Sequence, residues 1–375
     1  MKIAFFTASR ADYGKLKPVI TEALLKKIQL KIFVTGSHLI KEYGSTINQI
    51  SKDFGKEKIV SFSNQKFGES HSRIFNNTVN KFSKLINKKS FDCFFVHGDR
   101  IETLAAACVL TFSRIKIAHI EGGELSGTVD EMIRHSVTKL SHIHFVTNNA
   151  AKKVLINSGE NKNTIFVTGS PDIDILKKSS RPNIFNVKKK YEIFYNNYII
   201  SFLHPVTTQS RSDNKKNSEI YFKTISSLKN KNIIHFMPNN DDHSLVILKM
   251  MKKYLNNRKN IKIFSSMRFE HYLTLLENCE FIIGNSSSAI MEAPYFNVPS
   301  INLGNRQLNR FGLKKILNSE FNKKSILNAI KKVKMSNQNY RPIFGNGNSA
   351  KKIINVITSK KFDNLQIQKF YKNLR

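Results

Sequence analysis

The sequence predicts an α/β protein built from two Rossmann-like βα domains that face a central cleft. Short apolar runs of strand length alternate with helical stretches from the first residue. This alternation stops in a polar segment at residues 177–192, which contains Pro182, and then starts again. We therefore predict an N-terminal domain at residues 1–177, a linker at 178–195, a C-terminal domain at 196–358 and a tail at 359–375, with a ligand held between the domains.

The length and composition fit this organisation. A chain of 375 residues can form two ordinary cores, and 40% hydrophobic residues are typical of a globular protein. We find neither a signal sequence nor an apolar run long enough to span a membrane, and so expect a cytoplasmic protein with no membrane partner. Cys93, Cys108 and Cys279 lie far apart in the sequence, which predicts neither a disulfide framework nor a metal site.

The formal net charge of +34 raises the question of a nucleic-acid partner. The lysines are spread along the chain, and no recognition-helix, RNP-type or zinc-finger pattern accompanies them. We therefore expect a solvated basic surface, a polyanionic small ligand and no nucleic-acid partner. A nucleic-acid-binding protein is the alternative from another functional class, and a salt-titrated gel shift would test it.

The apolar runs give the order of the strands. In the first domain we predict strands at residues 2–7, 30–35, 58–62, 93–96, 115–118, 143–146 and 165–168. In the second domain we predict them at 198–203, 233–237, 261–264, 281–283 and 300–303. The segments between them predict helices, as expected for parallel sheets.

Ionisable residues follow two of these strands directly. Asp99 and Arg100 come after the strand at 93–96, and Glu121 follows the next strand. Because the carboxyl ends of parallel strands open onto the ligand crevice, these side chains are candidates for chemistry. Taken singly, Asp99 could cap the next helix and Glu121 could sit in a polar turn. Several such residues on neighbouring strand ends favour a functional site.

A third acid follows the Gly-Gly turn at residues 122 and 123. A helix is predicted to begin near Thr128, with Asp130 in its first turn. Asp130 and Arg134 are four residues apart and therefore share one face of this helix, while Glu131 and His135 share the adjacent face. A charged surface helix is the alternative, but a first-turn acid so close to the turn indicates the crevice.

Two segments have the features of phosphate-binding turns. Near the N-terminus, Arg10, Gly14 and Lys15 could offer a guanidinium, a close backbone and an ammonium to a diphosphate, although an ordinary basic helix explains them equally well. In the second half, the turn GNSSS at residues 284–288 exposes backbone N–H groups before a helix. A serine-rich helix cap is the alternative. Glu292, which could bind ribose hydroxyls, and Arg306 favour a nucleotide diphosphate.

At these motifs the chain resembles a known family. HGDRIETLAAA, HIEGGELSGTVDEMIRHSVTKLSH, the GNSSS turn with its following Glu, and INLGNRQ are together similar to the hydrolysing UDP-N-acetylglucosamine 2-epimerases of bacterial sialic-acid pathways. The epimerase half of the animal bifunctional epimerase/kinase is similar too. The resemblance implies the GT-B fold and conversion of UDP-GlcNAc and water to N-acetylmannosamine and UDP. It also implies no cofactor and no metal.

The resemblance assigns roles to individual residues. It implies a catalytic role for Asp99, Glu121, Asp130, Asp174 and His204. It implies contacts to the UDP-sugar from Arg10, Arg100, His204, Asn239, Ser286, Ser287, Glu292 and Arg306. Two departures are Gly14, where the animal enzyme has a serine, and the residues after Asn239, so feedback regulation is not carried over. We also expect a homo-oligomer, either a dimer or a tetramer.

The chemistry of this reaction requires several acids. Removal of the weakly acidic C2 proton must be coupled to loss of UDP from C1, which gives 2-acetamidoglucal, and hydration then needs a second acid and base. Relatives acting on UDP-2,4-diacetamido-2,4,6-trideoxyglucose for legionaminic acid share these needs and remain an alternative. A GT-B glycosyltransferase is a further alternative, as is a reversible non-hydrolysing epimerase. Which acid removes the proton is left open by the sequence.

Overall fold

The computed structural model describes residues 1–86, 91–176, 181–312, 316–333 and 343–369. The chain forms two compact units. The first contains residues 1–124, 130–177 and 343–375, and the second contains residues 125–129 and 178–342. Within the described ranges, no helix combines the length and the apolar character that a membrane crossing requires.

The first unit is a parallel α/β sheet in the strand order β3-β2-β1-β4-β5-β6-β7. Its strands are β1 (Lys2–Thr7), β2 (Gln29–Val34), β3 (Ile59–Ser61), β4 (Cys93–His97), β5 (Lys116–Ile120), β6 (Ile143–Val146) and β7 (Ile165–Val167). Its α-helices are α1 (Arg10–Leu25), α2 (Ile47–Phe54), α3 (His71–Leu85), α4 (Ile101–Phe112), α5 (Val129–Leu140), α6 (Asn149–Asn157), α7 (Asp172–Leu176), α14 (Ser349–Ile357) and α15 (Lys360–Asp363).

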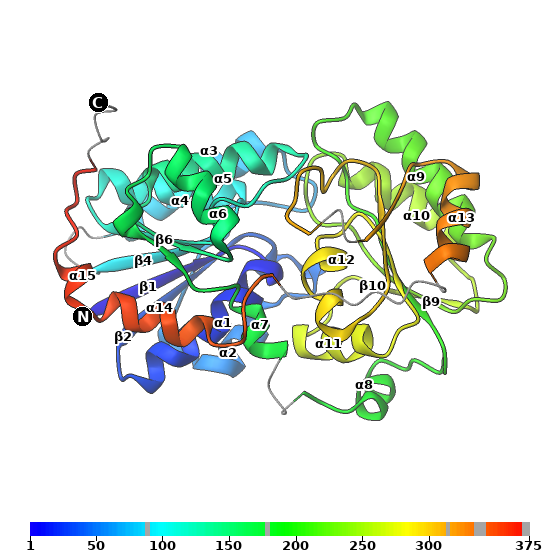
Figure 1. The fold of residues 1–375 in the computed structure, drawn as a ribbon, viewed down its shortest axis with the longest axis horizontal. Helices are drawn as coiled ribbons and strands as arrows, with labels where there is room; N and C mark the ends of the chain where they lie inside the picture. The colour runs from blue at the N-terminus through cyan, green and yellow to red at the C-terminus, as the bar shows by residue number, and fades with distance from the viewer. Residues whose placement is uncertain (87–90, 177–180, 313–315, 334–342, 370–375) are drawn as a thin grey trace. The chain divides into compact units, whose positions relative to one another are not determined.

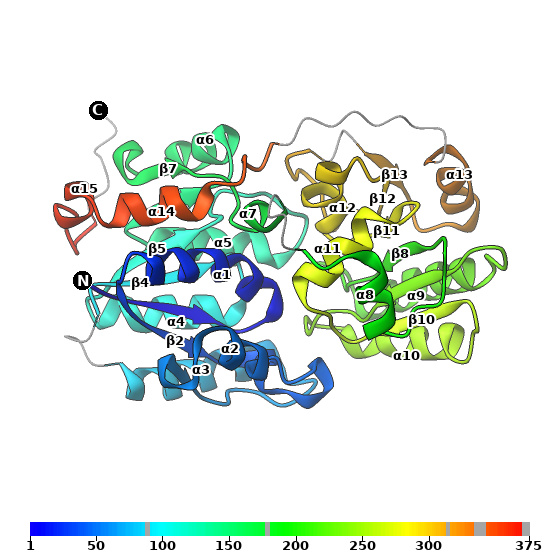
Figure 2. The same ribbon diagram turned by 90° about the horizontal axis from the view of Figure 1, so that it is seen from below.

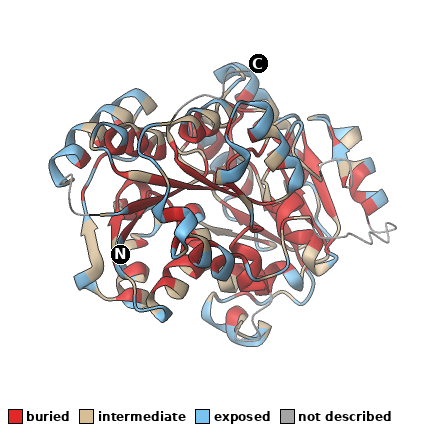
Figure 3. Ribbon diagram, turned by 60° about the vertical axis from the view of Figure 1, so that its left-hand side comes forward, coloured by how far each residue is buried: buried red, intermediate tan, exposed pale blue. Residues whose placement is uncertain are grey.

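Helices cover both faces of this first sheet (Figures 1 and 2). The two faces follow from the strand period of two, because neighbouring residues point to opposite sides. Phe5 and Phe95 stack at 4.8 Å in the core that includes α1 and α14. Phe6 and Phe94 point the other way and contact Phe82 of α3. The central strands β1 and β4 are therefore buried on both faces, and Figure 3 shows most strand residues as buried.

The second unit is a parallel sheet in the order β10-β9-β8-β11-β12-β13. Its strands are β8 (Ile199–Phe202), β9 (Ile233–Phe236), β10 (Ile261–Phe264), β11 (Ile282–Gly284), β12 (Ser300–Leu303) and β13 (Leu317–Ser319). Its α-helices are α8 (Ile184–Lys190), α9 (Arg211–Ser226), α10 (Ser244–Leu255), α11 (Phe269–Glu277), α12 (Ser288–Met291) and α13 (Lys323–Val333). One short 3₁₀ helix of this unit lies at Ala293–Phe296. Those of the first unit lie at Gly36–Leu39, Lys41–Tyr43, Lys56–Lys58 and Lys162–Thr164.

Each sheet contains a point where the strand order reverses. In the first unit it lies between β1 and β4, and in the second between β8 and β11. Ligands of open α/β sheets bind outside the carboxyl ends of the strands at such a point. At the second point Gly284 has a φ of 143°, and a Cβ there would stand 1.9 Å from the Phe202 carbonyl oxygen. Only glycine allows β11 and β8 to end side by side in this way.

Each predicted strand corresponds to a strand of the structure, to within a few residues. The sequence did not predict β13, nor the helix α8 inside the segment expected to be a linker. Residues 343–358 also differ from expectation, because Ile353 and Ile357 of α14 are buried in the core of the first unit and not of the second. The predicted boundary between residues 177 and 178 lies outside the described residues.

Candidate active site

The strand β4 ends at His97, and the residues after it lead into α4. The N-cap of α4 is Arg100, whose side chain makes no capping hydrogen bond. Asp99, the residue before it, is therefore not the N-cap residue of α4. Its carboxylate forms an ion pair with the guanidinium of Arg134 on α5.

Arg134 lies among three acidic residues. Besides the ion pair with Asp99, its Nη1 donates a 2.7 Å hydrogen bond to the backbone oxygen of Glu124. Burial by itself would lower the pKa of Arg134, but the charges of Asp99, Glu124 and Asp130 outweigh it and raise that pKa. The predicted position of Asp130 in the first turn of α5 is confirmed. Arg134 thus places a permanent positive charge beside two of the predicted catalytic acids.

Glu121 follows β5 with a backbone φ of 65°, which is unusual for a residue with a side chain. Such strained positions are enriched at functional sites. The residue is 6% exposed, so it does not sit in a solvated polar turn. Its Oε1 lies 3.0 Å from Lys15 Nζ, its Oε2 lies 3.2 Å from His97 Nε2, and the Ser170 hydroxyl also contacts it.

These neighbours determine the ionisation state of Glu121. Burial by itself would raise the pKa of the carboxyl, but the Lys15 ammonium, the His97 ring and the Ser170 hydroxyl outweigh burial and lower it. Glu121 is therefore a carboxylate at neutral pH. In that state it can accept a proton or stabilise positive charge, but it cannot act as the acid that enters the reaction protonated.

His119 within β5 holds the loop that carries Asp99. Its Nε2 lies 2.9 Å from the Gly98 carbonyl oxygen, and its Nδ1 lies 3.1 Å from the Thr138 hydroxyl. Burial lowers the pKa of His119 to about 3, so the ring is neutral. A neutral ring has one donor and one acceptor nitrogen, and the carbonyl requires the donor at Nε2. His119 thus ties β5 to the residue before Asp99.

Asp174 is placed differently from the other predicted acids. Its two carboxylate oxygens accept hydrogen bonds of 2.8 and 2.7 Å from the backbone N–H groups of Ser349 and Ala350. These groups open α14, and N–H groups at a helix start lack partners within the helix. The structure therefore gives Asp174 an anchoring role at α14 and shows no contact that joins it to Asp99, Glu121 or Asp130 in the described part of the chain.

The residues predicted to hold phosphate in the first unit lie at two strand ends. Arg10 is the first residue of α1, three residues after the end of β1, and Arg100 is the N-cap of α4, three residues after the end of β4. These two strands flank the reversal of strand order. Arg100 Nε lies 3.6 Å from Glu102. The structure therefore puts both guanidinium-bearing residues at the edge of the sheet where Asp99 and Glu121 lie.

In the second unit, His204 connects three strand ends. It follows β8, and its ring Nδ1 accepts a 3.1 Å hydrogen bond from the Asn239 backbone N–H. The backbone N–H of His204 donates to Asn285 Oδ1 at 2.7 Å. A nitrogen that accepts such a bond carries no proton, so the neutral ring holds its proton on Nε2. The side chain is thereby oriented with a donor at Nε2.

Arg306 lies beside the same strand ends. Its Nη1 donates to the Asn285 backbone oxygen at 3.3 Å, and its Nη2 lies 3.7 Å from Asp241. Asp241 also accepts a hydrogen bond from the side chain of Asn239. The predicted residues His204, Asn239 and Arg306 are thus brought together around Asn285, which the sequence analysis did not single out.

The serine turn surrounds the start of α12. Ser287 is the N-cap but makes no capping hydrogen bond with its side chain, and Ser286 Oγ accepts a weak 3.3 Å bond from the Ser288 N–H. Glu292 ends this short helix and is 6% exposed. Burial and the nearby Glu292 charge raise the pKa of Tyr272 well above its usual value. The serine-rich cap that we considered as an alternative therefore explains little of this turn.

The structure thus forms one cluster in each unit from residues distant in sequence. Sequence reasoning paired Arg134 with Asp130 but missed its ion pair with Asp99, and it did not indicate the contacts of His97, Ser170 and Asp172 around Glu121 and Lys15. It also missed Asn285 and Asp241 in the second unit. The sequence carried a signal for most of these residues. Four of them lie within two residues of a predicted site residue, namely His97, Asp172, Asn285 and Asp241, and Arg134 shares a face of α5 with Asp130. What the pattern could not supply was the pairing.

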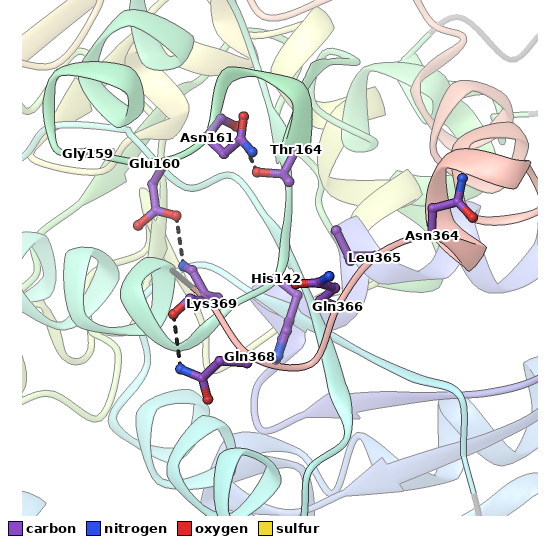
Figure 4. Close-up of a pocket in the computed structure, with 10 residues that line it drawn as sticks. All are labelled: His142, Gly159, Glu160, Asn161, Thr164, Asn364, Leu365, Gln366, Gln368 and Lys369. Atoms are coloured by element: carbon purple, nitrogen blue, oxygen red, sulfur yellow. Dashed lines mark hydrogen bonds and ion pairs between the residues drawn. The ribbon is translucent and has the colours of Figure 1, made fainter. Parts of the chain in front are cut away.

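A cavity of about 280 Å³ lies elsewhere in the first unit (Figure 4). The segments 159–164 and 364–369 line it, together with His142. Glu160 borders it and is held by Lys139, His144 and Lys369 at 2.7–3.1 Å. Burial opposes ionisation, but His144 and Lys369 lower the pKa of Glu160 to about 2. None of the predicted site residues lines this cavity, and its ion pairs tie the end of the chain to the sheet.

Comparison with known proteins agrees with these features. The family model described as UDP-N-acetylglucosamine 2-epimerase matches residues 22–358. A UDP-N-acetylglucosamine 2-epimerase of Neisseria meningitidis is 41% identical over 88% of this chain and 86% of its own length. A hydrolysing UDP-N,N'-diacetylbacillosamine 2-epimerase of Legionella pneumophila is 33% identical over 82% of this chain and 81% of its own.

The fold comparison gives the same result. The crystal structure of a Neisseria meningitidis UDP-GlcNAc 2-epimerase bound to UDP-GlcNAc matches with a TM-score of 0.78, at 18% identity, over 95% of this chain and 99% of that one. The predicted fold class, two parallel-sheet α/β domains of the GT-B type, is confirmed. The chain belongs to the UDP-N-acetylglucosamine 2-epimerase family.

Proposed function

We propose that this protein is a hydrolysing epimerase that converts UDP-N-acetylglucosamine and water to N-acetylmannosamine and UDP, and that it supplies nonulosonic acid biosynthesis. One observation carries the proposal. Asp99, Glu121 and Asp130 gather with Lys15, His97 and Arg134 at the carboxyl edge of one sheet, in a chain 41% identical to a UDP-GlcNAc 2-epimerase. The 33% identical Legionella relative is named as a hydrolysing 2-epimerase, which supports release of the free sugar by hydrolysis.

The proposed reaction has two steps, an elimination and a hydration. In the first, a carboxylate takes the C2 proton while the C1–O bond breaks and UDP leaves with its bonding electrons, which gives 2-acetamidoglucal. In the second, water adds to C1 and a proton is delivered to C2 from the opposite face, which inverts that centre. Glu121, which is held ionised beside Lys15, is able to accept a proton in the first step. Arginines at the strand ends suit the charge that develops on the departing diphosphate.

The second unit supports the nucleotide part of the proposal. The turn at Ser286 and Ser287 and the buried Glu292 lie beside the point where the strand order reverses. Arg306 presents a guanidinium at the end of the neighbouring strand. We assign UDP binding to these residues and to Asn239. We assign His204, with its proton on Nε2, to hydrogen bonding near the reacting sugar.

The mechanism predicts incorporation of solvent hydrogen. When the purified protein turns over UDP-GlcNAc in D₂O, we expect N-acetylmannosamine with deuterium at C2, because the proton lost in the elimination exchanges with solvent before hydration. Mass spectrometry and proton NMR of the product measure it. Product that keeps the original C2 hydrogen would rule out the elimination. Formation of UDP-linked N-acetylmannosamine in place of the free sugar would point to a reversible epimerase instead.

The same assay separates the glycosyltransferase alternative. The proposed reaction needs only the donor and water, whereas a transferase needs an acceptor. We therefore expect free N-acetylmannosamine and UDP in equal amounts from the donor alone. A protein that consumes the donor only after a sugar acceptor is added would be a transferase.

A second prediction concerns the sugar. C1 and C2 are chemically alike in UDP-GlcNAc and in the UDP-linked diacetamido sugar, so discrimination must come from groups that face C4 and C6. We expect kcat/KM to favour UDP-GlcNAc, in line with the higher identity to the epimerase named for that donor. Parallel assays with both donors measure the ratio. A preference of about tenfold or more for the diacetamido sugar would reassign the substrate while the mechanism stays the same.

A further inference from the structure

The side chain of Lys15 pairs with acidic and hydroxyl groups of the first unit, which the sequence did not indicate. Its Nζ lies 3.0 Å from Glu121 Oε1, 2.6 Å from Asp172 Oδ2 and 3.1 Å from Ser170 Oγ. An ammonium has three donor protons, and these three oxygens can accept one each. This geometry disfavours the interpretation in which Lys15 binds a diphosphate.

The group is buried and contains two carboxylates. The side-chain exposures are 13% for Lys15, 8% for Glu121 and 0% for Asp172. The Ser170 hydroxyl lies against both carboxylates but can donate its one proton to only one of them at a time. Two buried carboxylates therefore share the Lys15 ammonium, and removal of that cation would leave like charges facing one another.

The segment that supplies Ser170 and Asp172 is itself fixed by residues 344–349, which lead into α14. The Ser170 N–H donates to the Phe344 oxygen at 2.6 Å, and the Ser349 hydroxyl donates to the Ser170 oxygen at 3.1 Å. At Gly169, with φ of 87°, an added Cβ would lie 2.8 Å from the Cα of Gly345, so two backbones meet there. The network thus rests on packed backbone and has little freedom to move.

We propose that Lys15, Ser170 and Asp172 are positioning residues that hold Glu121 as a carboxylate in one orientation for the reaction. This inference rests on the proposed function. The groups that face Glu121 are Lys15 from α1, His97 from the end of β4, and Ser170 and Asp172 from the loop at the start of α7. Lys15 fixes Oε1, while Oε2 faces His97. Glu121 is then the acid that enters the first step already ionised.

The variant Lys15→Met tests this, because it keeps the length of the side chain and removes its charge. Without the cation, the pKa of Glu121 is expected to rise from its lowered value towards or above that of an ordinary carboxyl. We expect kcat at pH 7 to fall about 10- to 100-fold, the range that loss of positioning can cost. We also expect a new acid limb in the pH profile of kcat between about pH 5 and 8. Affinity for UDP should stay within about twofold of the wild type.

The protonation state can be read without any turnover. In protein labelled with ¹³C at the glutamate carboxyls, the Glu121 signal is assigned through Glu121→Gln. We expect no titration of this signal between pH 5 and 9 in the wild type and a titration inside that window in Lys15→Met. This readout separates the two proposals, because it stands whether or not UDP-GlcNAc is the substrate.

Two further variants keep the test decisive. Lys17→Met is the matched control, because Lys17 lies on the same helix and pairs with Asp53 at 3.0 Å, away from Glu121. It should leave kcat and its pH profile unchanged. Ser170→Ala removes one donor to Glu121 and should raise the pKa of Glu121 by a smaller amount. It serves as the test if circular dichroism shows that Lys15→Met does not fold.

Two outcomes would overturn the inference. If Lys15→Met lost UDP affinity while kcat at saturation and the Glu121 signal stayed as in the wild type, Lys15 would be a phosphate ligand. If stability fell but neither the pH profile nor the Glu121 signal moved in Lys15→Met or Ser170→Ala, the network would serve only to hold the fold.

Discussion

Glu121→Gln is expected to lower kcat by about 10²- to 10⁴-fold, the range typical of a positioned acid or base. The substitution keeps the volume of the side chain and removes the charge that Lys15 and His97 contact. A neutral amide cannot accept the C2 proton, so the loss should appear in kcat more than in KM. Steady-state rates of UDP release and calorimetric binding of UDP measure the two quantities.

Asp99→Asn and Asp130→Asn belong to the same prediction and should give losses in the same range. Both acids lie near Arg134, whose pKa their charges raise, so each substitution also changes the charge balance at that guanidinium. Because the two share this neighbour, their effects should not add in the double variant. UDP should still bind to each single variant.

Glu131→Gln is the control for these variants. Glu131 follows Asp130 directly on α5, but its carboxylate lies 3.8 Å from His135 on the adjacent face of the helix, as the sequence predicted. Its loss should leave kcat within about twofold, because partly exposed pairs of this kind contribute little. Near-normal rates in all three acid variants would mean that the catalytic site lies elsewhere.

Arg306→Ala should weaken UDP binding about 10- to 100-fold, because a hydrogen bond to a charged group contributes about 1.5–3 kcal/mol. Arg306 lies at the end of β12 and is held by the Asn285 oxygen, with Asp241 3.7 Å from its Nη2. A diphosphate at this strand end would give the guanidinium a second, stronger anion. Titration of UDP into the variant and the wild type measures the change.

The expected pattern for Arg306→Ala is a raised KM and a raised Kd for UDP, with a smaller change in kcat. Arg258→Ala is the matched control, because Arg258 is exposed and lies in the same unit between α10 and β10. A fall in kcat with unchanged affinity for UDP would place Arg306 at the reacting sugar and not at the nucleotide.

The sequence by itself determined the strands and the residues that follow them. The apolar run of β4 ends directly before His97 and Asp99, and that of β5 before Glu121, so the period and length of the runs were enough to place these acids at strand ends. Asp130 in the first turn of α5 and its face shared with Arg134 also follow from local rules. These features depend on residues close together in the chain.

Only the tertiary structure decided which groups pair. Lys15 and Glu121 are 106 residues apart, and Asp174 and Ser349 are 175 apart. No local pattern specifies such contacts, because they arise when helices pack on the sheet and a buried charge must find a partner. Packing also placed α14 in the core of the first unit, since its apolar face completes that core. The packing of buried charges, and not the local motif, therefore determines that Lys15 pairs with Glu121 and that Asp174 binds the start of α14.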